Sequence, residues 1–130
     1  MRTRTDIESY LMRSGLPYEE VEGKDLWLIE DPASSERVVI SLAGPLILFR
    51  VRVMEIEQVE RTADMFRLLL ELNASEMVHG AYGISGGAVV LTCALRMEDL
   101  DYNEFQAVID DFSLAFSNHY DLLAGFREAA

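Results

Sequence analysis

The chain has 130 residues, of which 50% are hydrophobic, and its 11 cationic and 23 acidic side chains give a formal charge of −12 at pH 7. A chain of this length and apolar content can bury one self-sufficient core, so we predict a single domain over residues 1–130. The acidic balance repels phosphate backbones and anionic lipid headgroups, which argues against nucleic acid and membrane surfaces as partners.

The cysteine content and the N-terminus predict a cytoplasmic protein. Cys93 is the only cysteine, so no disulfide can form within the chain, as is usual in a reducing cytoplasm. Since it lies in an apolar run, we expect its thiol to pack as a small hydrophobe. The N-terminus is polar, and no segment approaches the roughly 20 apolar residues that span a bilayer.

A short helix is expected near the start of the chain. Residues 5–8 read Thr-Asp-Ile-Glu and match a capping box, in which the Thr5 hydroxyl and the Glu8 carboxylate satisfy backbone N–H groups at a helix start. Gly15 can adopt the left-handed conformation that ends a helix. Pro17 then begins an extended segment.

Three strands are predicted next, at residues 26–30, 37–43 and 46–53, with a polar turn at residues 31–35. Gly44-Pro45 separates the last two, so we expect these two strands to pair antiparallel. In the third strand, alternation places Ile47, Phe49, Val51 and Val53 on one face and Leu46, Leu48, Arg50 and Arg52 on the other. One face would meet the core and the other would meet solvent or a partner.

From about residue 56 the apolar side chains are spaced by three and four, which predicts a helix. Its core-facing stripe would consist of Ile56, Val59, Ala63, Phe66 and Leu70. Asn73 could end the helix in a left-handed conformation. Further apolar residues make this helix apolar nearly all round, and the sheet, another helix or a second subunit could cover the additional side. We expect a homodimer interface at Leu68, Leu69 and Leu72.

The last third of the chain predicts a hairpin and a long helix. Gly86-Gly87 separates apolar runs at residues 77–85 and 88–95, and two glycines accept the positive φ angles of a tight turn. Asp101, followed by Glu104, predicts a capped start for an amphipathic helix that extends to about Leu123. The predicted order is helix, three strands, helix, two strands, helix: an α+β fold with one antiparallel sheet packed with helices.

This order, in a small acidic chain, resembles that of the class I type III secretion chaperones and the related bacterial YbjN-like domains. Residues 66–73 resemble the LLxLN helix end of these families, residues 83–91 their following hairpin, and residues 99–105 the loop that opens their last helix. Trp27, followed by the strand at residues 46–53 after Gly-Pro, is more similar to YbjN-like domains than to a dedicated secretion chaperone.

The resemblance implies a type III secretion chaperone-like fold over essentially the whole chain. YbjN-like domains are described as sensory-transduction regulators, with no enzyme activity implied. The chaperone family would imply a homodimer that holds an extended segment of a secreted client.

The sequence shows no catalytic, metal or cofactor pattern. Only His79 and His119 could serve as a histidine base, and neither is spaced to a nucleophile, so we expect both to be structural or solvated. The closest approach to a metal site combines the acidic pair 110–111 with His119 and Asp121, but adjacent helical residues point about 100° apart. We therefore expect no catalytic residue, no metal and no cofactor.

The pattern instead predicts a non-enzymatic protein-binding module, chaperone-like or a regulatory adaptor, that forms a homodimer. Leu46, Leu48, Arg50 and Arg52 are the predicted partner-binding residues. The arginines could pair with an acidic partner, or they could merely discourage edge-to-edge aggregation.

Other interpretations remain open at this point. Met54, Met65, Met77 and Met97 could line an adaptable groove or could simply fill the core. A dedicated chaperone for one client is an alternative of the same class. A small-molecule sensor with a pocket near His79 or His119 is an alternative of a different class.

Overall fold

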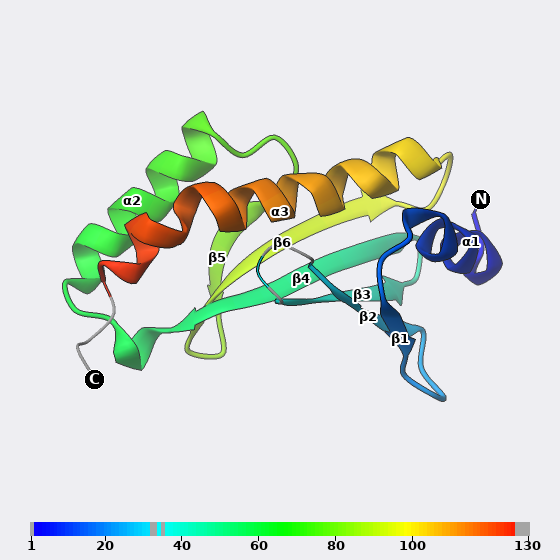
Figure 1. Ribbon diagram of the computed structural model, residues 1–130, viewed down its shortest axis with the longest axis horizontal. Coiled ribbons are helices and arrows are strands. Elements are labelled where there is room, and N and C mark those ends of the chain that lie inside the picture. The colour runs from blue at the N-terminus through cyan, green and yellow to red at the C-terminus, as the bar shows by residue number, and fades with distance from the viewer. Residues whose placement is uncertain (1, 32–33, 35, 127–130) are drawn as a thin grey trace.

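The computed structural model describes residues 2–31, 34 and 36–126 (Figure 1). The elements in chain order are α1 (Arg4–Ser14), β1 (Tyr18–Glu20), β2 (Leu26–Glu30), β3 (Arg37–Ala43), β4 (Leu46–Glu55), a 3₁₀ turn η1 (Ile56–Gln58), α2 (Thr62–Ser75), β5 (Ala81–Ser85), β6 (Ala88–Arg96) and α3 (Tyr102–Ala124). The predicted order is confirmed, and the extended segment after Pro17 adds the short strand β1. The predicted turn at residues 31–35 falls mostly outside the described residues.

The strands form one antiparallel sheet in the order β1-β2-β3-β4-β6-β5. The predicted pairing of β3 with β4 is confirmed, as is the hairpin between β5 and β6, where Gly86 and Gly87 take φ angles of 58° and 76°. All three helices lie on one side of the sheet, and in the described part of the chain no helix covers the other side (Figure 1).

The core lies between the sheet and the helices and is rich in aromatic side chains. The largest fully buried side chains are Trp27 of β2, Phe49 of β4, and Phe105 and Phe112 of α3. In β4, Ile47, Phe49 and Val51 are buried as the alternation predicts. The pairing register then shifts between Arg52 and Met54, so Met54 is buried and Val53 only partly so. This irregularity ends the simple alternation of the strand.

Helix α1 begins two residues before the predicted position. Its N-cap is Thr3, whose backbone N–H donates to the Asp6 carboxylate at 2.8 Å, so the capping box spans residues 3–6 and not 5–8. That hydrogen bond lowers the pKa of the Asp6 carboxyl. The earlier start places Arg4 in the first turn, where its guanidinium bonds to Glu20 and Asp25 of the β1–β2 hairpin. Gly15 ends the helix with a φ of 73°, as predicted.

Helix α2 is rotated relative to the prediction. It begins only at Thr62, because residues 56–58 form a 3₁₀ turn and Arg61 adopts a left-handed φ of 52°. The buried residues of the helix are Met65, Leu69 and Leu72. Ala63 and Leu70, expected to face the core, are exposed, so this part of the predicted stripe was wrong. The other three residues do contact the core, since Val59 is buried and Ile56 and Phe66 are partly buried against it. The interruption before Thr62 means that Ile56 and Val59 do not belong to the same helical face.

Asn73 does not end α2, which continues to Ser75. Its side-chain amide instead bonds to the backbone of the edge strand β5: Oδ1 accepts from the Tyr82 N–H at 2.7 Å, and Nδ2 donates to the Tyr82 carbonyl at 3.1 Å. The capping prediction at the last helix is confirmed, since the Asp101 carboxylate accepts from the Glu104 N–H at 2.8 Å at the start of α3.

Candidate functional site

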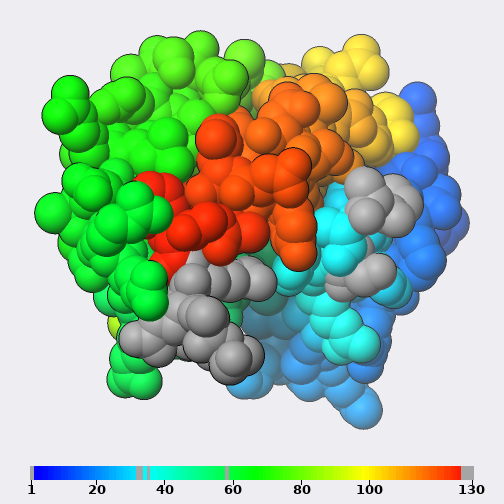
Figure 2. All heavy atoms as spheres, turned by 60° about the vertical axis from the view of Figure 1, so that its left-hand side comes forward, coloured from blue at the N-terminus to red at the C-terminus, as the bar shows by residue number. Residues whose placement is uncertain are grey.

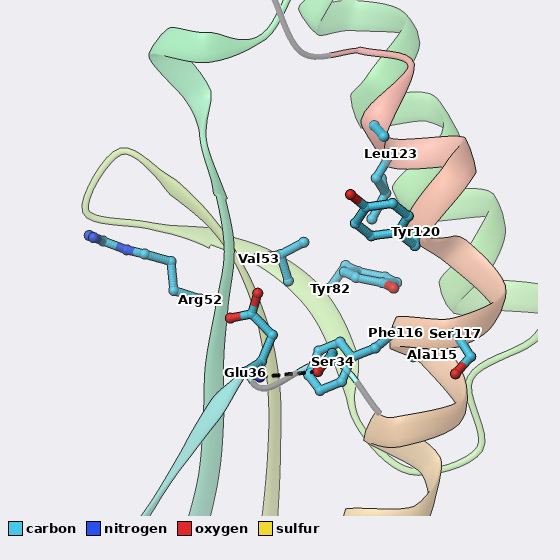
Figure 3. Close-up of a pocket in the computed structure, with 11 residues that line it drawn as sticks. Ser34, Glu36, Arg52, Val53, Tyr82, Ala115, Phe116, Ser117, Tyr120 and Leu123 are labelled. Carbon is cyan, nitrogen blue, oxygen red and sulfur yellow. Dashed lines mark hydrogen bonds between the residues drawn. The ribbon is translucent and has the colours of Figure 1, made fainter. Parts of the chain in front are cut away.

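The four predicted partner-binding residues lie together on the helix-free side of the sheet. They alternate along β4 with the buried Ile47, Phe49 and Val51, so they point away from the helices. Figure 3 shows Arg52 and Val53 on opposite sides of β4, with Val53 directed toward α3. The strand pairings place Leu48 beside Ser41 and Ala94, and Arg50 beside Val39 and Thr92.

Neighbouring strands extend this apolar surface. Leu28 of β2 pairs with Val39 of β3, which pairs with Arg50 of β4, and Leu46 pairs with Arg96 of β6. We call this surface the open sheet face; it consists of Leu26, Leu28, Val39, Leu46, Leu48, Arg37, Arg50, Arg52 and Arg96. Its five apolar side chains are half-buried only by their neighbours in the sheet. They remain available for contact with another molecule.

The open sheet face is locally cationic although the whole protein is acidic. It holds Arg37, Arg50, Arg52 and Arg96, all of them exposed. Arg52 forms an ion pair with Glu55 at 2.8 Å. Across the described ranges, the other three arginines have no ion pair with a carboxylate. The surface therefore combines leucine side chains with guanidinium groups that can bind an acceptor.

The sequence did not identify Arg37, Arg96 or the leucines of β2 as residues of this surface. Arg37 begins β3 and Arg96 ends β6, so each lies at a strand boundary where alternation is short. A signal was present in β3, because Val38 and Ile40 form its buried face and leave Arg37 and Val39 for the other. The sequence of a single strand does not show which face of the sheet lacks a helix.

The sheet edges offer less to a partner than its open face. On the β5 edge, Asn73 occupies both the N–H and the carbonyl of Tyr82, which an added strand would need. The opposite edge strand, β1, has only three residues and exposes Glu19 and Glu20. Short or charged edge strands discourage strand addition. Addition of a partner strand is thus disfavoured at both edges of the sheet.

The predicted dimer residues lie mostly inside the molecule. Leu69 and Leu72 are only 4% and 5% exposed and fill the core, and Leu68 is partly buried against it. Figure 2 shows α2, in green, at the surface of the molecule. Its outward side forms a shallow groove lined by Ala63, Phe66, Arg67, Leu70, Glu71 and Ala74. This outward surface includes Ala63 and Leu70, which we had expected to face the core.

Both histidines have hydrogen-bond partners. His119 is buried; its Nδ1 lies 2.7 Å from the Tyr82 hydroxyl and its Nε2 lies 2.7 Å from a carboxylate oxygen of Glu76. His79 pairs with Asp111 through Nδ1. Burial raises the pKa of Tyr82 to about 12, and the Glu76 charge adds to this effect. A phenol that holds its proton so firmly is a poor nucleophile, and the cluster ties α2, β5 and α3 together.

Within residues 2–31, 34 and 36–126, no group of three His, Cys, Asp or Glu side chains is arranged to hold a metal ion. Met54, Met65 and Met97 are buried in the core and Met77 is half-buried, so the methionines do not line a groove. Cys93 is half-buried, and burial, followed by the Asp111 charge, raises the pKa of its thiol. The described helices include none that is long and apolar enough to span a bilayer.

A cavity of about 370 Å³ lies between α3 and β4 (Figure 3). Val53, Phe116, Tyr120 and Leu123 contribute to its mostly apolar wall, and Ser34 and Glu36 lie at its border. The ring of Tyr82 lines it as well, but the Tyr82 hydroxyl is already bound to His119. The cavity thus lies beside His119, and Glu36, Ser117 and Tyr120 are among the polar residues that line it.

Comparison with solved structures places the fold. The chain is similar to a protein of the ExoU–SpcU complex from the Pseudomonas aeruginosa type III secretion system, with a TM-score of 0.71, 19% identity and coverage of 92% of this chain and 98% of that one. A chain of the ExsC–ExsE complex gives a TM-score of 0.70 at 18% identity, covering 95% and 97%. YbjN from E. coli gives 0.65 at 15% identity, covering 98% and 96%. The type III secretion chaperone-like fold is confirmed.

Comparison with curated protein sequences gave no match. The CesT_Tir_1 family model, however, matches residues 1–129. Together with the similarity to YbjN, this match confirms the resemblance to YbjN-like and secretion-chaperone proteins. The chain therefore belongs to the CesT_Tir_1 family.

Proposed function

We propose that this protein is a non-enzymatic protein-binding module, a chaperone-like or regulatory adaptor of the YbjN-like type, that holds a partner polypeptide on its open sheet face. The single observation that carries the proposal is the uncovered row of Leu46, Leu48, Arg50 and Arg52 on β4. The chaperone-like fold supports it, because similar structures come from the complexes ExsC–ExsE and ExoU–SpcU.

The chemistry of the open sheet face suits a polypeptide. Covering Leu46, Leu48 and their apolar neighbours removes hydrocarbon from water, which contributes roughly 25 cal/mol per Å². A stable complex buries about 800 Å² on each partner, so a segment that extends across several strands is required. The surrounding arginines can donate hydrogen bonds to a charged or carbonyl oxygen at the border of this apolar centre.

We also propose that two copies associate through α2, but by a different face from the one that the sequence suggested. Leu69 and Leu72 are already occupied by the core. In the outward stripe of Ala63, Phe66, Leu70 and Ala74, Phe66 is partly buried and the other three residues are exposed, Leu70 to 69%. Its two alanines would let a second helix approach closely, and Phe66 and Leu70 would supply the apolar contact.

The test is affinity capture of the tagged protein from its native cells, with the bound proteins identified by mass spectrometry. Leu48→Asp places a charge at the centre of the open sheet face, whereas Leu114→Asp makes the same change at an exposed site on α3. We expect one abundant partner that is lost with Leu48→Asp and kept with Leu114→Asp. A partner list that is identical for all three proteins would contradict the proposal.

The capture experiment also separates two forms of the proposal. One partner, bound stoichiometrically through an extended segment, would identify a dedicated secretion chaperone. Several partners would identify a regulatory adaptor. We expect both forms to act in the cytoplasm.

The cavity between α3 and β4 supports one candidate of a different class, a small-molecule sensor. Its volume of about 370 Å³ lies within the range of pockets that bind small ligands. A ligand that prefers the native state must stabilise it, so a thermal-shift screen of metabolites tests this function. Stabilisation that disappears in a Phe116→Trp variant, where the larger ring fills the cavity, would support the sensor.

A further inference from the structure

We propose that the open sheet face selects a partner segment that carries acidic side chains on both sides of an apolar centre. This inference rests on the proposed function and adds the chemistry of the partner. The protein has a charge of −12, yet four of its 11 cationic side chains lie on this one face. Such a concentration makes a local positive surface on an acidic molecule.

The carboxylates of the same face lie at its margins. Glu19 is on the edge strand β1, Glu30 ends β2, and Glu55 ends β4 and already neutralises Arg52. Arg50, within β4, and Arg96, at the end of β6, have no carboxylate partner in the described part of the chain. These two guanidinium groups are the ones best placed to pair with an incoming acidic residue.

The arrangement of charge and leucine sets the spacing that a partner must match. Arg96 pairs across the sheet with Leu46, and Leu48 and Arg50 follow Leu46 at alternate positions of β4. Alternate residues of a strand are separated by about 6.6–6.8 Å, which is also the spacing of same-side residues in an extended peptide. An extended segment with the same-side order apolar, apolar, acid therefore places its groups opposite Leu46, Leu48 and Arg50. An acidic residue that precedes the first apolar one lies near Arg96, which is beside Leu46 on β6.

A polypeptide fits this surface better than the other molecules that cations attract. Nucleic acid brings a dense row of phosphates toward a protein with a net charge of −12. It also leaves Leu46 and Leu48 without an apolar contact. A leucine-bearing acidic peptide satisfies both halves of the surface, and it limits its charge to the positions where arginines lie. Charge pairs of this kind mainly decide which partner binds and how fast.

The test uses a labelled peptide of the repeating pattern Glu-Ser-Leu-Ser-Leu-Ser, a matched peptide with Lys in place of Glu, and a single-stranded oligonucleotide, each measured by fluorescence anisotropy. We expect the Glu peptide to bind about tenfold or more tightly than the Lys peptide at low salt. The preference should weaken several-fold as roughly 0.3 M salt shortens the range of electrostatic attraction.

Variants assign the preference to the open sheet face. Arg50→Glu together with Arg96→Glu should reverse the preference between the two peptides. The control Arg13→Glu removes an exposed arginine of α1, on the helix side of the sheet, and should leave the preference unchanged. Circular dichroism confirms that each variant is folded.

The outcomes also distinguish the inference from the proposed function. Tighter binding of the Lys peptide or the oligonucleotide would overturn the inference, as would a preference that survives the double variant, or no peptide binding at all. The proposed function fails only if the partner captured from cells is insensitive to Leu48→Asp. If the Lys peptide binds strongly and Leu48→Asp abolishes this binding, the acidic preference is overturned. The open sheet face would still be the binding surface.

Discussion

The two faces of the sheet are formed by the same strands, but only one of them is packed against the rest of the chain. Phe49 points into the core and is 1% exposed, whereas the next residue of β4, Arg50, is exposed on the open sheet face. The packing partners of Phe49 are supplied by the chain itself, among them Phe105 at a ring-centroid distance of 5.6 Å. The leucines opposite have only their strand neighbours. The comparison teaches that one strand can serve the stability of the protein with one side and the binding of a partner with the other.

The largest effect on stability is expected on β4, where substitutions at neighbouring positions compare its core side with its open side. Phe49→Ala leaves a cavity in the packed aromatic core and should lower the free energy of unfolding by about 3–5 kcal/mol. Leu48→Ala, one residue away on the open sheet face, should lower it by less than about 1 kcal/mol. Urea denaturation of both variants measures the difference. Equal losses would mean that the open sheet face is covered in solution.

The same contrast exists on α2, where neighbouring leucines point in opposite directions. Leu69→Ala removes a core side chain and should cost about 2–4 kcal/mol of stability. Leu70→Glu should leave the fold intact, because that side chain is 69% exposed, but it should abolish the proposed dimer. Light scattering after gel filtration measures the oligomeric state. A dimer that persists with Leu70→Glu would show that two copies associate elsewhere or not through α2.

The fold could be predicted from the sequence because several local signals agree. The Gly86-Gly87 turn, the Asp101 cap and the alternation from Leu46 to Val51 each fix one element, and all three are found where the sequence places them. Local agreement of this kind is what specifies a fold. The phase of α2 could not be predicted in the same way, since its two apolar stripes satisfy the helical period equally well.

The candidate site could be predicted only in part. Alternation separated Leu46, Leu48, Arg50 and Arg52 from the core side of β4, but their contacts with β3 and β6 depend on the pairing register. The contacts of His119 connect residues 43 and 37 positions away in sequence, with no pattern that joins them. Asn73 did carry a signal, because a polar side chain inside an apolar helix needs a partner, but the sequence could not identify that partner as β5.

A smaller effect on stability is expected from Asn73, whose side chain binds the backbone of the edge strand β5. Asn73→Ala leaves the N–H and the carbonyl of Tyr82 without their partner and should cost about 1–3 kcal/mol of unfolding free energy. Asn73→Asp keeps an acceptor for the N–H but loses the donor, so its loss should be intermediate. Hydrogen exchange of the Tyr82 amide measures the local opening. Unchanged exchange in Asn73→Ala would mean that another group closes this edge.

The smallest effect on stability is expected from the ionisation of Tyr82, which lies on β5 and is hydrogen-bonded to His119 of α3. Burial, and then the charge of Glu76, raise the pKa of its hydroxyl from 10.0 to about 12 in the folded protein. Because the native state holds this proton more firmly than the unfolded chain, the stabilisation is complete below pH 10 and is lost as the pH rises toward 12. Urea denaturation across this interval should therefore show a steeper loss for the parent protein than for Tyr82→Phe, with Tyr18→Phe as the control for removal of an exposed phenol. If the unfolding free energy falls equally with pH in the parent and in Tyr82→Phe, Tyr82 releases its proton as readily in the folded protein as in the unfolded chain. That result would mean that water reaches the Tyr82 hydroxyl in the folded protein.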